Sequence, residues 1–361
     1  MMIAQGRYTS GRIAIANLSA VVNSEETRRK EGATFDGLVA LSNLLFLRGD
    51  VLGRIADHDR GETIANEAIA LSPGTAEALY IRARLAGRFH RFAAASALLD
   101  QAFAAGYASR KIDAERAALL QATGKYSAAL VLRERLAAHD PDISTLGALA
   151  SLLAEMGQWE EAESCYAGAL DADKGVSPFP CAQLLFEWGV SAMRRGELER
   201  ADAILSDLDA ILPAHVPGRG HRAEVALARG RSDLALSLIT PLLEASDDPE
   251  YRATYAEILA ARGDYTAACK AEGTTIAYEL LLARRSEAYA DHAAAFFLGV
   301  GNRPERAVEL AFANWKLRDT PHSRKLLANA KRKAQQTSAP SLDPKPSSTR
   351  PPHKFDAMAG A

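Results

Sequence analysis

The sequence contains little cysteine and has no excess of either charge. Only three cysteines, Cys165, Cys181 and Cys269, occur in 361 residues, which is too few for a disulfide framework, and none has the spacing of a zinc site. We therefore expect buried, inert thiols and a cytoplasmic protein. The 43 Lys and Arg residues nearly balance the 45 Asp and Glu residues, for a net charge of −2. Nucleic acid is therefore not the expected partner, because its binding needs a basic surface.

Long apolar runs and catalytic signatures are also missing. The longest candidate run, from Ile13 to Val22, is interrupted by Asn17 and Ser19 and falls short of the roughly 18 apolar residues that a membrane span needs. It is also a poor signal peptide, which makes secretion or a periplasmic location the weaker alternative. The sequence has no Gly-x-Ser-x-Gly, no Gly-x-x-x-x-Gly-Lys and no His-Glu-x-x-His motif. We expect no membrane span, no cofactor, no metal and no enzymatic activity.

Alanine is abundant, and small residues recur along the chain at a fixed period. One set of alanines, spaced 33 to 39 residues apart, consists of Ala95, Ala129, Ala162, Ala201, Ala235, Ala268 and Ala307. Another small residue lies twelve positions before each of them: Ala83, Ala117, Ala150, Gly189, Ala223, Ala256 and Ala295. A short polar break with glycine usually separates the two. A period near 34 residues predicts a helical repeat protein.

The spacing has a physical explanation in helix hairpins. Where two antiparallel helices cross, small residues on both sides let the backbones approach to about 8 Å. Glycine between them ends the first helix, because it adopts the left-handed conformation at little cost. An aromatic residue after the break, at Tyr126, Trp159 or Tyr265, is expected to fill the space above the crossing.

This pattern resembles the tetratricopeptide repeat, which has small residues at its eighth and twentieth positions, glycine in the turn and proline near its end, as at Pro141 and Pro213. The resemblance covers about residues 76–315 in seven hairpins, with a degenerate hairpin before them at 36–72. The family's tryptophan at position four is absent. The resemblance implies an all-α fold: an α-solenoid of about eight hairpins that form a right-handed superhelix.

The two ends of the chain differ from the repeats. Residues 1–33 are expected to form an N-terminal segment with a capping helix from Gly11 to Val22 and a charged connection after it. The solenoid is expected over residues 34–333, with a last helix that begins at Pro321 and ends near Lys333. Proline and serine dominate residues 334–361, which predicts a disordered tail because too little apolar surface can be buried.

In the family, the first helix of each hairpin lines a concave groove that binds partners. On this sequence the resemblance places the groove residues at Tyr80, Arg84, Arg88, Lys111, Gln183, Phe186, Arg194, Glu224, Glu257, His292 and Phe296. The Lys and Asn clamp with which some members hold a C-terminal carboxylate is missing. The groove is basic at one end and acidic at the other, which suits a protein or peptide of mixed charge.

The sequence gives only weak indications of metal binding, catalysis or phosphate binding. Asp57-His58-Asp59 could bind a metal and Asp291 beside His292 could act as a base, but neither has converging partners of suitable spacing. The Arg-rich stretches near Arg84 and Arg194 are expected to be salt-bridged surfaces rather than phosphate contacts. The sequence therefore predicts a non-catalytic scaffold or adaptor. The alternatives are a peptide-gated regulator that changes curvature and, less favoured, an enzyme with an unfamiliar site.

Overall fold

A computed structural model describes residues 7–338, and these residues contain helices and no strand. The helices are α1 (Gly11–Glu31), α2 (Phe35–Leu52), α3 (Ile55–Leu71), α4 (Ala76–Arg88), α5 (Phe92–Ala104), α6 (Ser109–Ala122), α7 (Tyr126–His139), α8 (Ile143–Glu155), α9 (Trp159–Ala172), α10 (Pro178–Arg194), α11 (Leu198–Ile211), α12 (Val216–Ala228), α13 (Ser232–Ile239), α14 (Leu242–Ala245), α15 (Pro249–Ala261), α16 (Ala267–Leu298), α17 (Pro304–Leu317) and α18 (Pro321–Ser338). The predicted all-α fold is confirmed.

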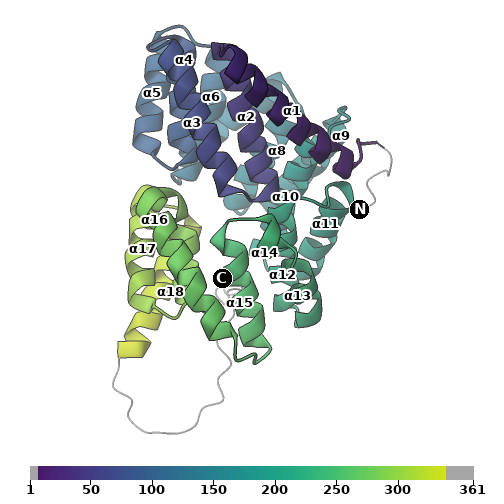
Figure 1. Ribbon diagram of the computed structural model, residues 1–361, viewed down its shortest axis with the longest axis vertical. Helices are drawn as coiled ribbons and strands as arrows, with labels where there is room; N and C mark the ends of the chain where they lie inside the picture. Colours follow the sequence, from purple (N-terminus) through teal and green to yellow (C-terminus); the bar gives the residue numbers. More distant parts are fainter. Residues whose placement is uncertain (1–6, 339–361) are drawn as a thin grey trace.

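Consecutive helices pack as antiparallel hairpins, and the hairpins follow one another along a curved path (Figure 1). Helices α2 and α3 form the first hairpin, and the pairs from α4 and α5 to α12 and α13 form the next five. α16 belongs to two hairpins, because Arg285 has non-helical angles (φ −143°, ψ 41°) that divide it. Its first half pairs with α15 and its second half with α17. The eight hairpins make the predicted α-solenoid.

The small residues lie where the two helices of a hairpin cross. Ala150 and Ala162 are 0 % and 2 % exposed, and both belong to the largest apolar cluster. At Gly189 even a methyl group would be too large, because a Cβ there would lie 2.7 Å from Leu205 Cδ2. The turn glycines at 124, 157, 196, 230 and 263 have φ between 73° and 80°. Small residues and turn glycines thus have the roles that the sequence predicts.

The predicted register is wrong around the α15–α16 turn. The side chain of Asp264 accepts hydrogen bonds from the backbone N–H (2.8 Å) and hydroxyl (2.7 Å) of Thr266. This local bonding delays the start of α16 to Ala267, so Ala267 is buried and Ala268 is exposed. Tyr265 lies in the turn and is 93 % exposed instead of covering the crossing.

The register also shifts in the second half of α16. Ala294 is fully buried there, whereas the predicted Ala295 is only half-buried. The interruption at Arg285 changes the angular phase of the helix that follows it. Ala307, on the facing helix α17, is fully buried as expected.

The N-terminal segment is more regular than the sequence suggested. α1 continues through the charged residues to Glu31 as one helix. Its last turns are held by ion pairs with α3, between Arg60 and Glu26 at 2.8 Å and between Arg29 and Glu67 at 2.7 Å. The expected charged connection is therefore part of the helix.

At the other end, α18 starts at Pro321 as predicted and continues to Ser338, five residues beyond the expected end. Lys333 helps to fix this helix, since its Nζ donates to the Leu298 carbonyl at 3.1 Å. Of the predicted disordered tail, residues 334–338 are helical, and residues 339–361 lie outside the described part of the chain.

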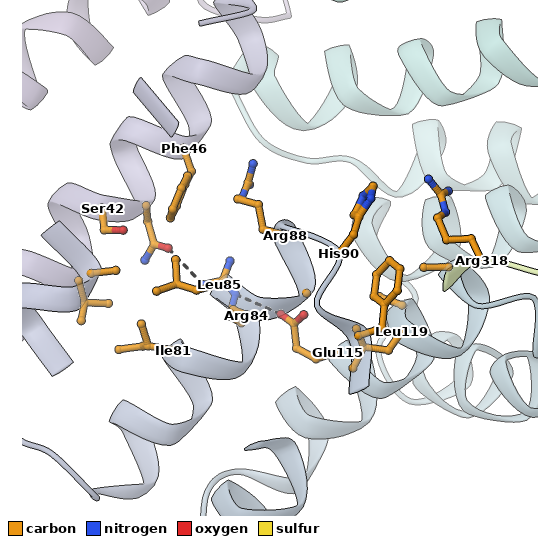
Figure 2. Close-up of a pocket in the computed structure, with 17 residues that line it drawn as sticks. Ser42, Phe46, Ile81, Arg84, Leu85, Arg88, His90, Glu115, Leu119 and Arg318 are labelled. Carbon is orange, nitrogen blue, oxygen red and sulfur yellow. Dashed lines mark hydrogen bonds and ion pairs between the residues drawn. The ribbon is translucent and has the colours of Figure 1, made fainter. Parts of the chain in front are cut away.

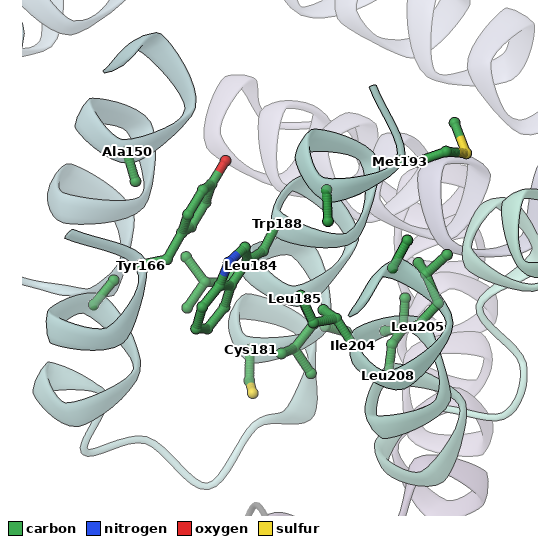
Figure 3. Close-up of a cluster of buried hydrophobic side chains, with 14 of the residues drawn as sticks. Ala150, Tyr166, Cys181, Leu184, Leu185, Trp188, Met193, Ile204, Leu205 and Leu208 are labelled. Atoms are coloured by element: carbon green, nitrogen blue, oxygen red, sulfur yellow. The ribbon is translucent and has the colours of Figure 1, made fainter. Parts of the chain in front are cut away.

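The largest apolar cluster lies in the middle of the solenoid, across α8 to α12 (Figure 3). Tyr166 stacks on Trp188 with ring centroids 5.3 Å apart. Val51 and Leu52, from the end of α2, belong to the same cluster. The first hairpin therefore packs on a part of the chain more than 100 residues away, and the solenoid curls back on itself.

Replacing Ala162 with leucine is expected to lower the free energy of unfolding by about 1–3 kcal/mol, because the larger side chain overpacks the crossing. Urea denaturation measures the change. Ala268→Leu is the matched control, since Ala268 is exposed, and its effect is expected to stay within about 0.5 kcal/mol. Equal losses from the two substitutions would contradict the register described above.

Candidate binding cavity on the concave face

An open cavity of about 400 Å³ lies on the concave face, between the first helices of three successive hairpins. Most of its apolar lining comes from α2, α4 and α6, including Val39, Phe46, Ile81, Leu85, Ala118 and Leu119, and Ala65 of α3 and Phe92 of α5 complete it. Its polar lining includes Arg84, Arg88, His90, Glu115 and Arg318 (Figure 2). Arg318 follows α17, so the C-terminal part of the chain closes one end of a cavity that the N-terminal hairpins form.

Arg84 lies in the cavity wall between two neighbouring hairpins. Its Nε is 3.1 Å from Glu115 Oε1 on α6, and its Nη1 donates to Asn43 on α2 at 3.1 Å. Tyr80 donates its hydroxyl to the same Glu115 at 3.2 Å and stacks on Tyr107. Burial raises the pKa of Tyr80 above its ordinary value, and the Glu115 charge adds to that effect. These contacts hold Arg84 in one orientation.

Arg88 is bound more tightly than Arg84. Its guanidinium donates to both carboxylate oxygens of Asp50, at 2.7 and 3.0 Å, and lies 4.4 Å from the centre of the Phe46 ring. Burial alone would raise the pKa of Asp50, but hydrogen bonds from His58 and Arg88 lower it to about 2. Asp50 is therefore ionised at neutral pH, and Arg88 is a fixed part of the wall.

His90 occupies the turn position that glycine has in the later hairpins, with φ of 59°. This left-handed conformation is uncommon for residues other than glycine. His90 Nδ1 lies 3.0 Å from the carbonyl oxygen of Glu287, which belongs to the far end of the solenoid. Burial, and secondly the charge of Arg318, lower the pKa of His90. The strained turn at His90 thus makes a contact between the two ends of the solenoid.

A second polar cluster surrounds His292. Its Nδ1 lies 3.2 Å from Glu250 Oε2, and its Nε2 lies 3.8 Å from Asp291. Asp291 also pairs with Arg318 at 3.2 Å. The Glu250 charge raises the pKa of His292 to about 10, so the imidazole is charged at neutral pH. Asp291 and His292 are therefore engaged in ion pairs, which does not favour their predicted alternative role as a catalytic pair.

The predicted groove residues differ in exposure. Arg84 and Arg88 line the cavity, while Tyr80 supports it through Glu115. Gln183, Lys111, Arg194 and His292 are exposed, whereas Phe186 and Glu257 are half-buried. Whether these residues contact a partner stays a prediction.

The prediction of groove residues is wrong for Phe296 and Glu224. Phe296 is 2 % exposed and packs on Tyr278 and Phe297 in the apolar core, because the break at Arg285 turns it inward. Glu224 is 3 % exposed and is bonded to His221 (2.9 Å) and Thr254 (3.2 Å). Neither side chain is available to a partner on the surface.

The sequence reasoning missed several cavity residues. Phe46 belongs to the degenerate first hairpin, for which no groove positions were assigned. Glu115 could have been found, since it lies on α6 four residues after the predicted groove residue Lys111, on the same face of the helix. Nothing in the sequence marks Arg318 as a cavity residue, because only the curvature of the whole solenoid brings it to α4.

The structure also places the residues considered for a metal site and for phosphate contacts. Asp57 binds Arg48 and Asp59 binds Arg285, both through ion pairs. Within the described residues, no group of three or more His, Cys, Asp and Glu side chains is placed to hold a metal ion. The arginine stretches are salt-bridged as expected, for example between Arg194 on α10 and Glu155 on α8 at 4.0 Å.

Two further observations concern the cysteines and the membrane. Cys181 is buried and Cys165 is half-buried, but the expectation of burial is wrong for Cys269, which is exposed. None of the helices between residues 7 and 338 has the length and apolar character of a membrane span.

Comparison with known proteins concerns the fold. No family model matches the sequence, and a search of curated proteins finds no match. A chain of the APC/C hetero-tetramer Cut9-Hcn1 is similar in structure, with a TM-score of 0.50 and 15 % identity over 82 % of this chain and 55 % of that chain. A tetratricopeptide repeat protein from Parabacteroides merdae has a TM-score of 0.42 and 15 % identity, with 82 % and 98 % of the two chains covered.

These identities support a likeness of fold only. The hairpins, their crossings at small residues and their turn glycines define the class: a helical-repeat protein. More particularly, the fold is a solenoid of tetratricopeptide type, which confirms the resemblance predicted from the sequence.

The ion pair of His292 with Glu250 makes stability depend on pH. The pKa in the folded chain, about 10, exceeds the ordinary value of about 6.5. The pair therefore stabilises the fold fully below about pH 6.5, and this contribution declines as the pH rises toward 10. Replacing His292 with glutamine should lower the Tm more at about pH 6 than at about pH 10. The difference is expected to be modest, because the side chain is 44 % exposed. An equal loss of Tm at both pH values would contradict the raised pKa.

Proposed function

We propose that this protein is a non-catalytic scaffold or adaptor that binds a protein or peptide segment in the cavity between α2, α4 and α6. The single observation that supports this most strongly is an open cavity of about 400 Å³ on the concave face. That volume falls within the range of about 300–1,000 Å³ typical of ligand sites. The proposal includes no catalytic step.

The walls of the cavity suggest how a segment would bind. Phe46, Ile81 and Leu119 supply apolar surface that an aliphatic or aromatic side chain can cover. The charged groups are already oriented, since Arg84 is held by Glu115 and Arg88 by Asp50. A partner would therefore lose little affinity to the ordering of these side chains.

The polar rim suits a segment of mixed charge. Arg84 and Arg88 retain N–H groups beyond those that bind their carboxylates, and Glu115 is an acceptor beside them. We propose that apolar side chains of the partner bind the floor and that its polar groups bind this rim. An amphipathic helix or an extended peptide fulfils both conditions.

A second candidate function is a regulator whose curvature changes when a peptide binds. One observation favours it: the far end of the solenoid reaches the first hairpins through ion pairs between α16 and α3. Such a contact can separate without exposing a large apolar core. In this alternative the cavity is the site at which the regulating peptide acts.

Filling the cavity tests the proposal. Peptides are selected from a displayed random library on the wild-type protein, and their affinities are then measured by calorimetry. Ala118→Trp is expected to weaken these peptides at least about tenfold, because the indole occupies the apolar floor and removes about 1.4 kcal/mol or more of binding free energy. Charge reversal at Arg84 and Arg88 is less clean, since it also breaks their ion pairs.

The matched control is Ala128→Trp, which places the same side chain at an exposed position of the adjacent helix α7. We expect it to leave affinity unchanged. Circular dichroism checks that both variants keep their helical content. Peptides that bind Ala118→Trp as tightly as the wild type would contradict the proposed site.

A further inference from the structure

The solenoid is closed by contacts between parts of the chain that are not neighbours in the repeat. One contact lies at the α2–α3 turn, where Gly53 is so close to Val216 and Tyr251 that a Cβ would lie 2.9 Å from one and 3.0 Å from the other. Val51 and Leu52 extend this contact into the largest apolar cluster. This joint is tightly packed and combines apolar contacts with hydrogen bonds, because the Asp247 carboxylate accepts from the backbone N–H groups of Ile55 (2.7 Å) and Ala56 (3.0 Å).

The second contact is ionic. Arg285 of α16 donates to Asp59 (2.6 Å) and Glu62 (2.6 Å) of α3, more than 220 residues away in the sequence. Arg284 donates to Asp59 at 3.0 Å. The Arg285 guanidinium also lies 3.9 Å from the centre of the Phe89 ring. We call Asp59, Glu62, Arg284 and Arg285 the clasp.

Apolar packing contributes little beside the clasp. Ala288 is the part of α16 that packs on the apolar cluster of Phe46, Ala65, Leu85 and Phe89. A methyl group buries far less surface than the side chains at the first joint. Separating the clasp therefore exposes mainly charged groups that water can solvate. A third contact lies at the α6–α7 turn, where a Cβ on Gly124 would overlap the carbonyl oxygen of Asp319.

The clasp lies at the kink of α16, where the regular helix is already interrupted. A kink of this kind lets the two halves of a helix change their angle without breaking a continuous hydrogen-bond ladder. His90, whose imidazole contacts Glu287 just beyond the kink, also lines the cavity. Movement at the clasp would therefore move one wall of the cavity.

We propose that the clasp is a conformational latch that holds the solenoid closed and sets the width of the cavity. When it opens, the joint at Gly53 remains packed, while the segment from the α16 kink to α18 moves away from α3, from His90 in the α4–α5 turn and from Gly124 in the α6–α7 turn. The cavity then widens at the end formed by His90 and Arg318. The consequence for a bound partner rests on the proposed function, but the latch itself does not.

A distance measurement without any partner tests the latch. Spin labels are attached to cysteines that replace Asn66 on α3 and Lys316 on α17, both exposed, in a chain whose native cysteines are replaced by serine. The variant Asp59→Asn with Glu62→Gln removes both carboxylates of the clasp. Electron–electron double resonance is expected to give a longer mean distance and a broader distribution than in the labelled parent chain.

The matched control removes two carboxylates from another arginine. Glu279→Gln with Glu309→Gln leaves Arg306 without its partners, at 2.8 and 2.9 Å, and changes the net charge equally. It should leave the distance unchanged. Identical distributions in the clasp variant and the labelled parent would overturn the proposal, and so would an equal shift in the control.

Circular dichroism first checks that the clasp variant is folded. If it loses helical content, the labelled parent chain is compared at low salt and at about 1 M NaCl, where the Debye screening length is about 3 Å. A longer distance at high salt supports the latch, and an unchanged distance overturns it. Because no peptide is used, either result is independent of whether the cavity binds one.

Discussion

The close approach of two helices at small residues is the interaction on which the rest of this structure depends. Ala150 and Ala162 allow it in one hairpin, and a Cβ at Gly189 would prevent it in the next, where Leu205 fills the space. Once each hairpin has this geometry, neighbouring hairpins stack with a small rotation. The accumulated rotation brings α16 to α3 and closes the solenoid, as Figure 1 shows.

Ion pairs between neighbouring hairpins occupy the inner charges. Here Arg88 pairs with Asp50 and His292 pairs with Glu250, so the inner surface is a network of ion pairs. Partly buried pairs of this kind orient side chains more than they stabilise the fold. The cavity between α2, α4 and α6 interrupts this network with apolar surface, which is why we propose it as the binding site.

The repeat could be predicted from the sequence, because crossing residues and turn glycines obey local rules. Ala83, Ala117 and Ala223 are buried at the predicted positions. The rules failed where local bonding or a kink changed the helical phase: the Asp264 side chain shifted the start of α16, and the break at Arg285 turned Phe296 into the core. Of the residues that line the cavity, Arg84 and Arg88 could be anticipated from the sequence. Arg318 could not, because the curvature of the entire chain, which no single repeat encodes, brings it there.

The central claim is that the concave cavity is where this solenoid binds a partner. A crystal structure of the protein with a peptide selected on it tests this most directly. The account predicts peptide density along α2, α4 and α6, with an apolar side chain against Phe46 and Leu119. Density for the peptide on the outer face, with the cavity empty, would contradict it.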